Sequence, residues 1–166
     1  MPGRLFAMRR LLASVLLAAP IPTPIGFGPR YQLPAGPPSA TRLACSQSVR
    51  LRDLAHVELF ANKRVLLLPK GIGAAAGCDY PVRTTTPFGV VEFAPAAKPT
   101  LGDLFDVWGQ PLSDRGFAGF RGAVSAWVGG RRWPGDVRAI PLRRHAEIVV
   151  EVGGYIPPHS FYLFTR

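Results

Sequence analysis

The chain is poor in the residues on which most enzymes depend. It contains 3 histidines, 2 cysteines and 10 acids among 166 residues. Nucleophilic catalysis needs an activated serine or cysteine beside a base, and no nucleophile motif surrounds His56, His145 or His159. A phosphate-binding glycine loop is absent too, because Gly71-Ile-Gly73 is not followed by a helical pattern. We therefore expect a protein that is not an enzyme and carries no cofactor.

The sequence also lacks an apolar run long enough to cross a bilayer, which needs about 20 residues. The apolar run at residues 11–19 ends at Pro20 and follows Arg4, Arg9 and Arg10 without an acid. This pattern is typical of a secretory signal peptide over residues 1–19, with Met8 as an alternative start. We expect a secreted or extracytoplasmic protein, anchored by the N-terminal segment if that segment stays uncleaved.

Long helices are disfavoured by the 18 prolines and 18 glycines, together 36 of the 166 residues. Seven of these prolines fall in residues 20–44, which predicts a disordered linker rich in proline and glycine. Residues 45–166 then remain for a single domain, and a hydrophobic content of 48% is sufficient for its core.

Positive charge exceeds negative charge by 10 at pH 7. The excess predicts either an ordinary solvated surface or a face that binds polyanions. Arg131 and Arg132 beside Trp133, together with Arg143 and Arg144, are the candidate anion-binding residues. For an exported protein this indicates a cell-envelope polymer or an acidic lipid surface, and we expect no nucleic acid. The alternative is that Arg143 and Arg144 form surface pairs with Glu147 or Glu151, which stabilise by only about 0–1 kcal/mol.

The two cysteines, Cys45 and Cys78, predict one disulfide in an exported domain. On the chain-entropy model, closing this loop stabilises the fold by roughly 3–4 kcal/mol.

Strand patterns begin after residue 54. The apolar runs at residues 56–60 and 64–68 flank an Asn-centred turn and predict a β-hairpin. A second hairpin is expected where residues 124–128 lead into a Gly-Gly turn, and the alternation of residues 147–152 predicts a half-buried strand. The aromatic tail that follows would cover the sheet edge or pack on the core.

Residues 100–108 predict the single clear helix. Thr100 is an N-cap with Asp103 at the capping-box position, and Gly109 is a stop signal. Leu101, Leu104, Phe105 and Trp108 share one face. We expect an α+β fold, a small and mostly antiparallel β-sheet from two hairpins with one short helix packed on it. A β-grasp-like arrangement has these ingredients.

Several segments resemble an uncharacterised family of small exported bacterial proteins. They are residues 78–80 (CDY), 89–91 (GVV), 100–109 (TLGDLFDVWG), 135–136 (GD) and 140–145 (IPLRRH). The family pattern reads HxHxH, CxYWLHTHD, GVIH and a TLGxFFxxWG helix, and the resemblance covers roughly residues 51–158.

The family's histidines imply a transition-metal site, since alternate residues of a strand share one side. This chain keeps only one of the family's six histidines, His56. The other positions hold Arg52, Leu54, Arg83, Thr85 and Glu92, with Thr86 at the acid. The resemblance thus implies a non-catalytic exported binding or structural domain with a degenerate metal site. The alternative is a zinc- or copper-binding protein using the residual ligands His56, Cys78 and Glu92, beside Asp79.

Overall fold

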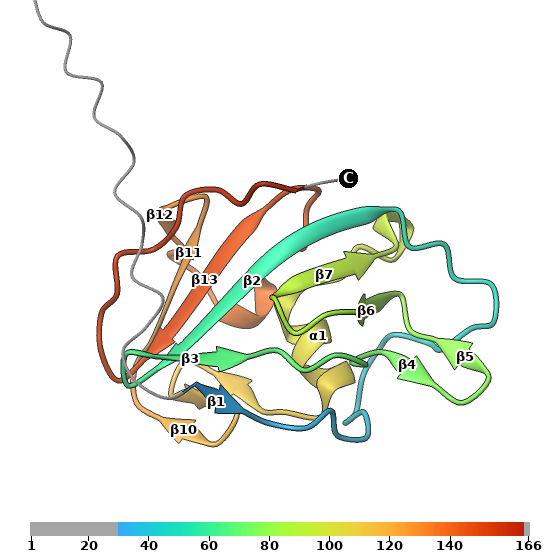
Figure 1. Ribbon diagram of the computed structural model, residues 1–166, viewed down its shortest axis with the longest axis horizontal. Coiled ribbons are helices and arrows are strands. Elements are labelled where there is room, and N and C mark those ends of the chain that lie inside the picture. Colours follow the sequence, from blue (N-terminus) through green and yellow to red (C-terminus); the bar gives the residue numbers. More distant parts are fainter. Residues whose placement is uncertain (1–29, 165–166) are drawn as a thin grey trace, which may run out of the picture.

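The computed structural model describes residues 30–164 as a β-sheet curved around one short helix (Figure 1). The expected signal peptide, and residues 20–29 of the expected linker, lie outside the described residues.

The main sheet is built from eight strands. They are β1 (Tyr31–Gln32), β2 (Asp53–Ala61), β3 (Arg64–Leu67), β6 (Val82–Thr84), β7 (Val90–Phe93), β11 (Val124–Val128), β12 (Arg131–Arg132) and β13 (Glu147–Val152). Two small sheets pair β4 (Ala74–Ala75) with β5 (Cys78–Asp79), and β8 (Leu112–Ser113) with β9 (Gly116–Phe117) and β10 (Phe120–Arg121). The helical segments are η1 (Pro95–Ala97), α1 (Leu101–Trp108) and η2 (Val137–Ala139).

The long strand β2 organises the sheet. The strand order of the sheet is β1-β3-β2-β13-β11-β12. In addition, β7 pairs with the first half of β2, and β6 pairs with β7. Most pairs are antiparallel, but β2 and β13 lie parallel in the centre, with Glu147 opposite His56. The predicted α+β class is confirmed. A hairpin, a helix and a final strand parallel to the first are also the features of a β-grasp-like arrangement.

The first hairpin turns where the Asn-centred signal predicted. Asn62 and Lys63 have φ angles of 51° and 62°. Positive φ at both central residues defines the type I′ turn that suits a two-residue hairpin.

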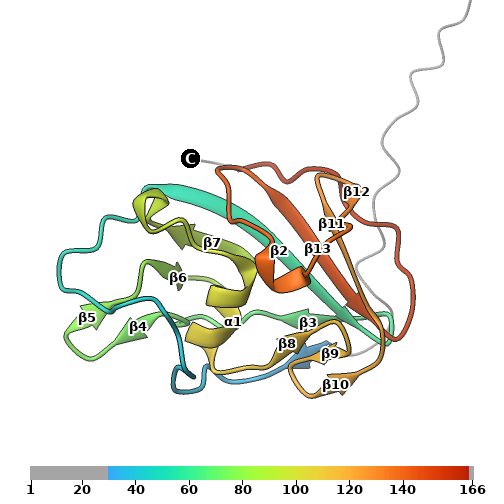
Figure 2. The ribbon, with the colours of Figure 1, turned by 180° about the vertical axis from the view of Figure 1, so that it is seen from behind.

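Helix α1 follows its sequence signals. The Thr100 hydroxyl accepts the Asp103 backbone N–H, and the Asp103 carboxylate accepts the Thr100 N–H at 2.7 Å, which completes the capping box. Gly109 ends the helix with φ 74°. Leu101, Leu104 and Trp108 are fully buried against one side of the sheet, the side that faces the viewer in Figure 2.

The proline content assigned residues 30–44 to a disordered linker, but in the structure they begin with β1, which pairs with β3, and continue along α1. The N–H groups of Gly36 and Ser39 donate to the carbonyls of Trp108 and Asp106, at 3.2 and 2.8 Å. The last carbonyls of any helix lack partners within it, so these bonds give the segment a defined place. The Trp108 indole donates in turn to the Pro34 carbonyl. A polyproline-type segment has no internal backbone hydrogen-bond ladder, but its N–H and carbonyl groups can still bond to a neighbouring element.

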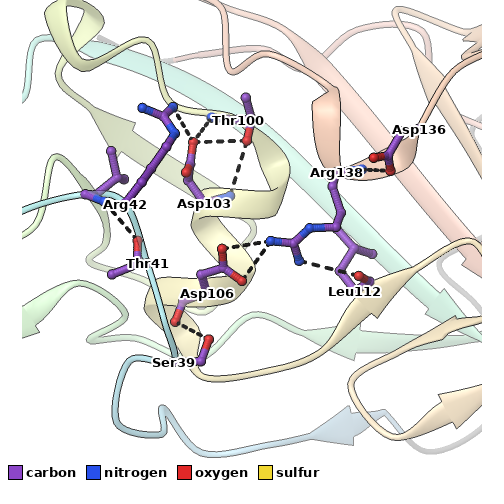
Figure 3. A network of polar contacts seen from close by, with 10 residues as sticks. Ser39, Thr41, Arg42, Thr100, Asp103, Asp106, Leu112, Asp136 and Arg138 are labelled. Carbon is purple, nitrogen blue, oxygen red and sulfur yellow. Dashed lines mark hydrogen bonds and ion pairs between the residues drawn. The ribbon is translucent and has the colours of Figure 1, made fainter.

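Two arginines from distant segments hold the polar side of the helix (Figure 3). Arg42, from the N-terminal segment, lies 2.7 Å from the Asp103 carboxylate. Arg138, from η2, reaches both oxygens of Asp106 at 2.9 and 2.7 Å. The two acids are therefore fully explained by capping and ion pairing.

The disulfide between Cys45 and Cys78 is present, as predicted, with a sequence separation of 33. It ties the N-terminal segment to β5, beside a backbone bridge between Ser46 and Asp79.

Both faces of the central strands are covered. One face carries the main core, in which Val57, Leu59, Ile148 and Val150 pack with the α1 side chains. On the other face Phe60 and Val149 pack with Ile156 of the C-terminal segment. The prediction of a half-buried β13 is therefore wrong, because all six of its residues are buried. The segment after β13, dark red in Figure 1, runs back past β11 and β12 toward the C label.

Within residues 30–164, no helix is both long and apolar enough to cross a membrane.

Candidate functional site

The polar groups with chemical potential lie on the sheet face opposite the helix. Side chains alternate along a strand, so His56 and Glu58 of β2 point to the same face as Phe60. Glu147 and Glu151 of β13 occupy the same face beside Val149, because Glu147 pairs with His56 and Glu151 with Phe60. The C-terminal segment covers this face, so these polar groups are largely removed from water. We call His56, Glu58, Glu147 and His159 the His–Glu cluster.

His56 is held from both sides of its ring. Its Nε2 lies 2.9 Å from the Phe88 carbonyl, which can only accept, so Nε2 carries a proton and donates. Its Nδ1 lies 3.0 and 2.8 Å from the two carboxylate oxygens of Glu147. One proton therefore sits between Nδ1 and Glu147. The pair is either an imidazolium with a carboxylate or a neutral imidazole with a carboxylic acid.

The loop before β7 approaches His56 through a glycine. Gly89 has φ 76°, and a Cβ at this position would lie 3.0 Å from His56 Nε2 and 2.5 Å from the Val57 carbonyl oxygen. This close approach brings the Phe88 carbonyl within hydrogen-bonding distance of His56 Nε2.

Glu58 has a histidine partner from the C-terminal segment. His159 Nδ1 lies 2.7 Å from a Glu58 carboxylate oxygen. One ligand atom each from His56, Glu58 and Glu147 lies within 4.8 Å of the other two. A cavity of about 160 Å³ adjoins the cluster and is lined by His56, Glu58, His159, Arg30 and Phe88, among others.

Burial changes the acidity of two carboxyls on this face. Desolvation raises the pKa of Glu147, and the hydrogen bond from His56 partly opposes the rise. Desolvation also raises the pKa of Glu151 to about 7, against the hydrogen bond that the Ile156 N–H donates to it.

Aromatic rings of the C-terminal segment close over the histidines. Tyr162 stacks on His56 with ring centroids 3.8 Å apart, and Phe164 stacks on His145 at 4.7 Å. The aromatic tail was expected to cover the sheet edge or to pack on the core, and the structure instead stacks two of its rings on histidines.

A second candidate region is a polar hollow of about 560 Å³ at the start of β2. We call it the arginine hollow. Its lining residues are Leu51, Arg52, Leu54, Arg83, Thr85, Glu92, Arg144 and His145. Arg52 and Arg144 are exposed, whereas Arg83 is half-buried. Three arginines and one glutamate are among its lining residues, and of the arginines Arg83 pairs with the glutamate.

Arg83 is fixed in the hollow by two acids. Its guanidinium lies 3.0 Å from Asp79 and 2.8 Å from Glu92, and the hydrogen bond with Glu92 raises its pKa. Its Nε–H is buried and finds no acceptor within the described chain. Arg83 is thus held in a fixed position at the wall of the hollow, where two carboxylates accompany its charge.

The predicted metal ligands do not come together. Cys78 is oxidised in the disulfide, so it offers no thiolate to an ion. Glu92 pairs with Arg83 in the arginine hollow rather than with His56. Asp79 also pairs with Arg83. His56 does belong to a ligand-bearing cluster, but its neighbours there are Glu58 and Glu147.

The predicted anion-binding arginines separate into two pairs. Arg131 and Arg132 lie exposed on the short strand β12. Arg143 and Arg144 lie in the loop before β13, where Arg144 joins the arginine hollow. The alternative pairing of Arg143 or Arg144 with Glu147 or Glu151 is wrong, because both glutamates are buried under the C-terminal segment.

Most positions that the resemblance aligns with histidines line the arginine hollow. Arg52, Leu54, Arg83, Thr85 and Glu92 meet there, without His56. In this chain two of those five positions hold an arginine and none holds a histidine. The resemblance itself remains a prediction.

Sequence reasoning missed Glu58, Glu147 and His159 as neighbours of His56. The spacing His56-x-Glu58 was a usable signal, because it puts both residues on one side of a strand. Glu147 could not be found this way, since it reaches His56 through parallel pairing across 91 residues.

The fold and these two regions define a disulfide-linked α+β domain with a basic hollow and a buried His–Glu cluster. Comparison with models of protein families, with curated proteins and with solved structures finds no match to this chain.

Proposed function

We propose that this protein is a non-catalytic, exported binding domain that takes anionic groups of a cell-envelope polymer in the arginine hollow. The observation that carries the proposal is the convergence of Arg52, Arg83 and Arg144 on one polar hollow. Guanidinium groups match the geometry of phosphate and carboxylate oxygens, and they stay charged at every physiological pH.

The distribution of charge over the described chain supports an anionic partner. Residues 30–164 hold 16 lysines and arginines, of which Arg42, Arg83 and Arg138 form the ion pairs with acids. The remaining 13 are exposed. Six of the ten acids form ion pairs with arginine or histidine, and a seventh, Glu151, is buried. The surface field is therefore more positive than the net excess of 6 positive charges (16 basic minus 10 acidic residues) in residues 30–164 indicates.

Arg83 supports the same proposal at closer range. A buried donor without an acceptor costs about 1–3 kcal/mol, and the Arg83 Nε–H is such a donor within the described residues. An anion oxygen that accepts a hydrogen bond from this N–H would remove the cost.

Catalysis receives no comparable support. Within residues 30–164, the hydrogen bonds of the histidine rings go to glutamates and to one backbone carbonyl, and none goes to a serine or cysteine side chain. Both cysteines are oxidised. Export is supported by the disulfide, which is typical of an oxidising compartment, and by the signal-like residues 1–19.

The test compares binding of polyphosphate, a soluble phosphate polymer, by two matched double variants. Arg52→Gln with Arg144→Gln removes two charges from the hollow, and Arg115→Gln with Arg121→Gln removes two exposed charges outside it. We expect the hollow variant to lose affinity about tenfold more than the control, because long-range attraction is equal in the two proteins. Fluorescence titration at several salt concentrations measures the polyphosphate affinity of each variant.

Equal losses in both variants would reduce the proposal to unspecific attraction. An acidic lipid surface is the alternative partner, and flotation with phosphatidylglycerol vesicles tests it in parallel. The proposed polymer partner would be overturned if vesicles bind more tightly than polyphosphate and if the variant Arg52→Gln with Arg144→Gln still binds them.

A further inference from the structure

The His–Glu cluster contains more potential metal ligands than the packing of the fold requires. A buried sheet face is usually apolar, yet here two glutamates and one histidine place ligand atoms within 4.8 Å of one another. His56 and Glu147 are 5% and 2% exposed. Burying carboxylates costs free energy unless a positive charge compensates them. Apart from the histidines themselves, no ion pair in residues 30–164 provides that charge to Glu58 or Glu147.

The orientation of His56 is the one that a metal ligand adopts. Metal-binding histidines donate their other ring N–H to a carbonyl or carboxylate, which fixes the tautomer and the ring. His56 Nε2 makes such a bond to the Phe88 carbonyl at 2.9 Å. The Nδ1 atom is thereby directed at the carboxylate of Glu147.

We propose that the His–Glu cluster is a site for a divalent transition metal, with Zn²⁺ bound by His56 Nδ1, Glu58 and Glu147. His159 lies beside these three residues, with its Nδ1 2.7 Å from Glu58, and is the candidate for a fourth ligand from the C-terminal segment. Imidazole nitrogen and carboxylate oxygen are ligands that zinc accepts. Two carboxylates neutralise the ion, so the loaded site buries no net charge.

The geometry needs a modest closure. Zinc binds nitrogen and oxygen at about 2.0–2.2 Å in a tetrahedron, which puts ligand atoms roughly 3.4 Å apart. The present spread of up to 4.8 Å contracts to that distance by side-chain rotation, because β2 and β13 already hold the Cα atoms in register. The adjoining cavity provides an entry route to Glu58 and His159.

This site is independent of the arginine hollow. The two regions share no lining residue, since His56, Glu58 and His159 border one cavity and Arg52, Arg83 and Arg144 the other. It also differs from the ligand set His56, Cys78 and Glu92 that the sequence predicted.

Calorimetric titration of the oxidised, chelator-treated full chain with ZnCl₂ tests the proposal. We expect one equivalent to bind with micromolar or tighter Kd and to raise Tm. Glu58→Gln and Glu147→Gln should each weaken binding at least tenfold, since an amide is a poorer zinc ligand than a carboxylate. Asp114→Asn, which changes an exposed carboxylate outside both the cluster and the arginine hollow, should alter Kd less than twofold.

A direct spectroscopic readout covers the case in which one glutamine variant does not fold. The ¹⁵N chemical shift of His56 Nδ1 should move to that of a metal-bound nitrogen when zinc is added to the unaltered protein. Absence of stoichiometric binding, an unchanged His56 signal, or equal affinity in the folded Glu58→Gln and Asp114→Asn variants would each overturn the site.

Discussion

At the scale of single residues, burial has its clearest consequence at Glu151. This carboxyl is 2% exposed and accepts the Ile156 N–H at 3.1 Å. Among the described residues no cation lies within ion-pair distance of it. Since burial penalises only the charged form, its pKa rises from 4.5 to about 7.

The pH dependence of stability follows from that rise. Between pH 4.5 and 7 the folded state holds a proton on Glu151 that the unfolded state has released. The stabilising contribution is therefore complete below pH 4.5 and is lost as pH rises through 7. At about 1.4 kcal/mol for each pKa unit, the loss is at most about 3 kcal/mol.

We predict that Glu151→Gln removes this part of the pH dependence. Glutamine retains a carbonyl oxygen for the Ile156 N–H but carries no charge. The variant should gain stability over the unaltered protein as pH rises from 5 to 8, by up to about 3 kcal/mol. Urea unfolding at both pH values measures the difference. A constant difference between the two proteins would contradict the assignment.

His56 shows what a sequence can and cannot say about one residue. The sequence indicated that His56 lies on a strand and that Glu58, two residues later, points to the same side of it. Its partners were not, because Phe88 and Glu147 reach it from two other elements. Cys78 illustrates the opposite error, since one residue cannot serve in a disulfide and offer a thiolate ligand at the same time.

At the scale of elements, α1 was predictable almost completely. Its cap, its apolar stripe and its terminal glycine are local signals, and each one appears in the structure. The segments that cover the helix and the sheet were less predictable. Residues 30–44 and the C-terminal segment have no regular pattern of their own, so only their contacts order them.

The C-terminal segment should contribute to stability through its inward-facing residues. Ile156 is 3% exposed between Phe60 and Val149, whereas Leu163 is 77% exposed. We predict that Ile156→Ala costs about 2–5 kcal/mol, the usual range for truncating a buried aliphatic side chain. Leu163→Ala is the matched control and should change stability by less than about 0.5 kcal/mol.

Denaturant unfolding monitored by tryptophan fluorescence provides the measurement for both variants. If Ile156→Ala and Leu163→Ala prove equally stable, the C-terminal segment does not cover this face of the sheet in solution.

At the scale of the whole molecule, the disulfide links the N-terminal segment to β5 in the small β4–β5 sheet. The enclosed separation of 33 residues restricts the unfolded chain, which on the entropy model stabilises the fold by roughly 3–4 kcal/mol. We predict that Cys45→Ala with Cys78→Ala lowers the free energy of unfolding by about this amount. Equilibrium unfolding of the variant and of the oxidised protein measures it, and a loss below about 1 kcal/mol would show that the bond is dispensable.

Charge is also a property of the whole molecule. The sequence records an excess of +10, but folding sorts the charges. It directs six acids into pairs and leaves 13 basic side chains of residues 30–164 exposed. Composition cannot show this sorting, because pairing depends on which residues meet in space.

The sequence by itself determined the local structure of this protein. The capping box at Thr100, the type I′ turn at Asn62 and the pairing of the two cysteines depend on residue types at short range or on there being only two partners. The tertiary structure alone decided which strands meet. Parallel pairing of β2 with β13 brings Glu147 to His56 across 91 residues. Such contacts depend on the packing of the whole chain, and no local pattern encodes them, so both candidate sites emerge only in the folded molecule.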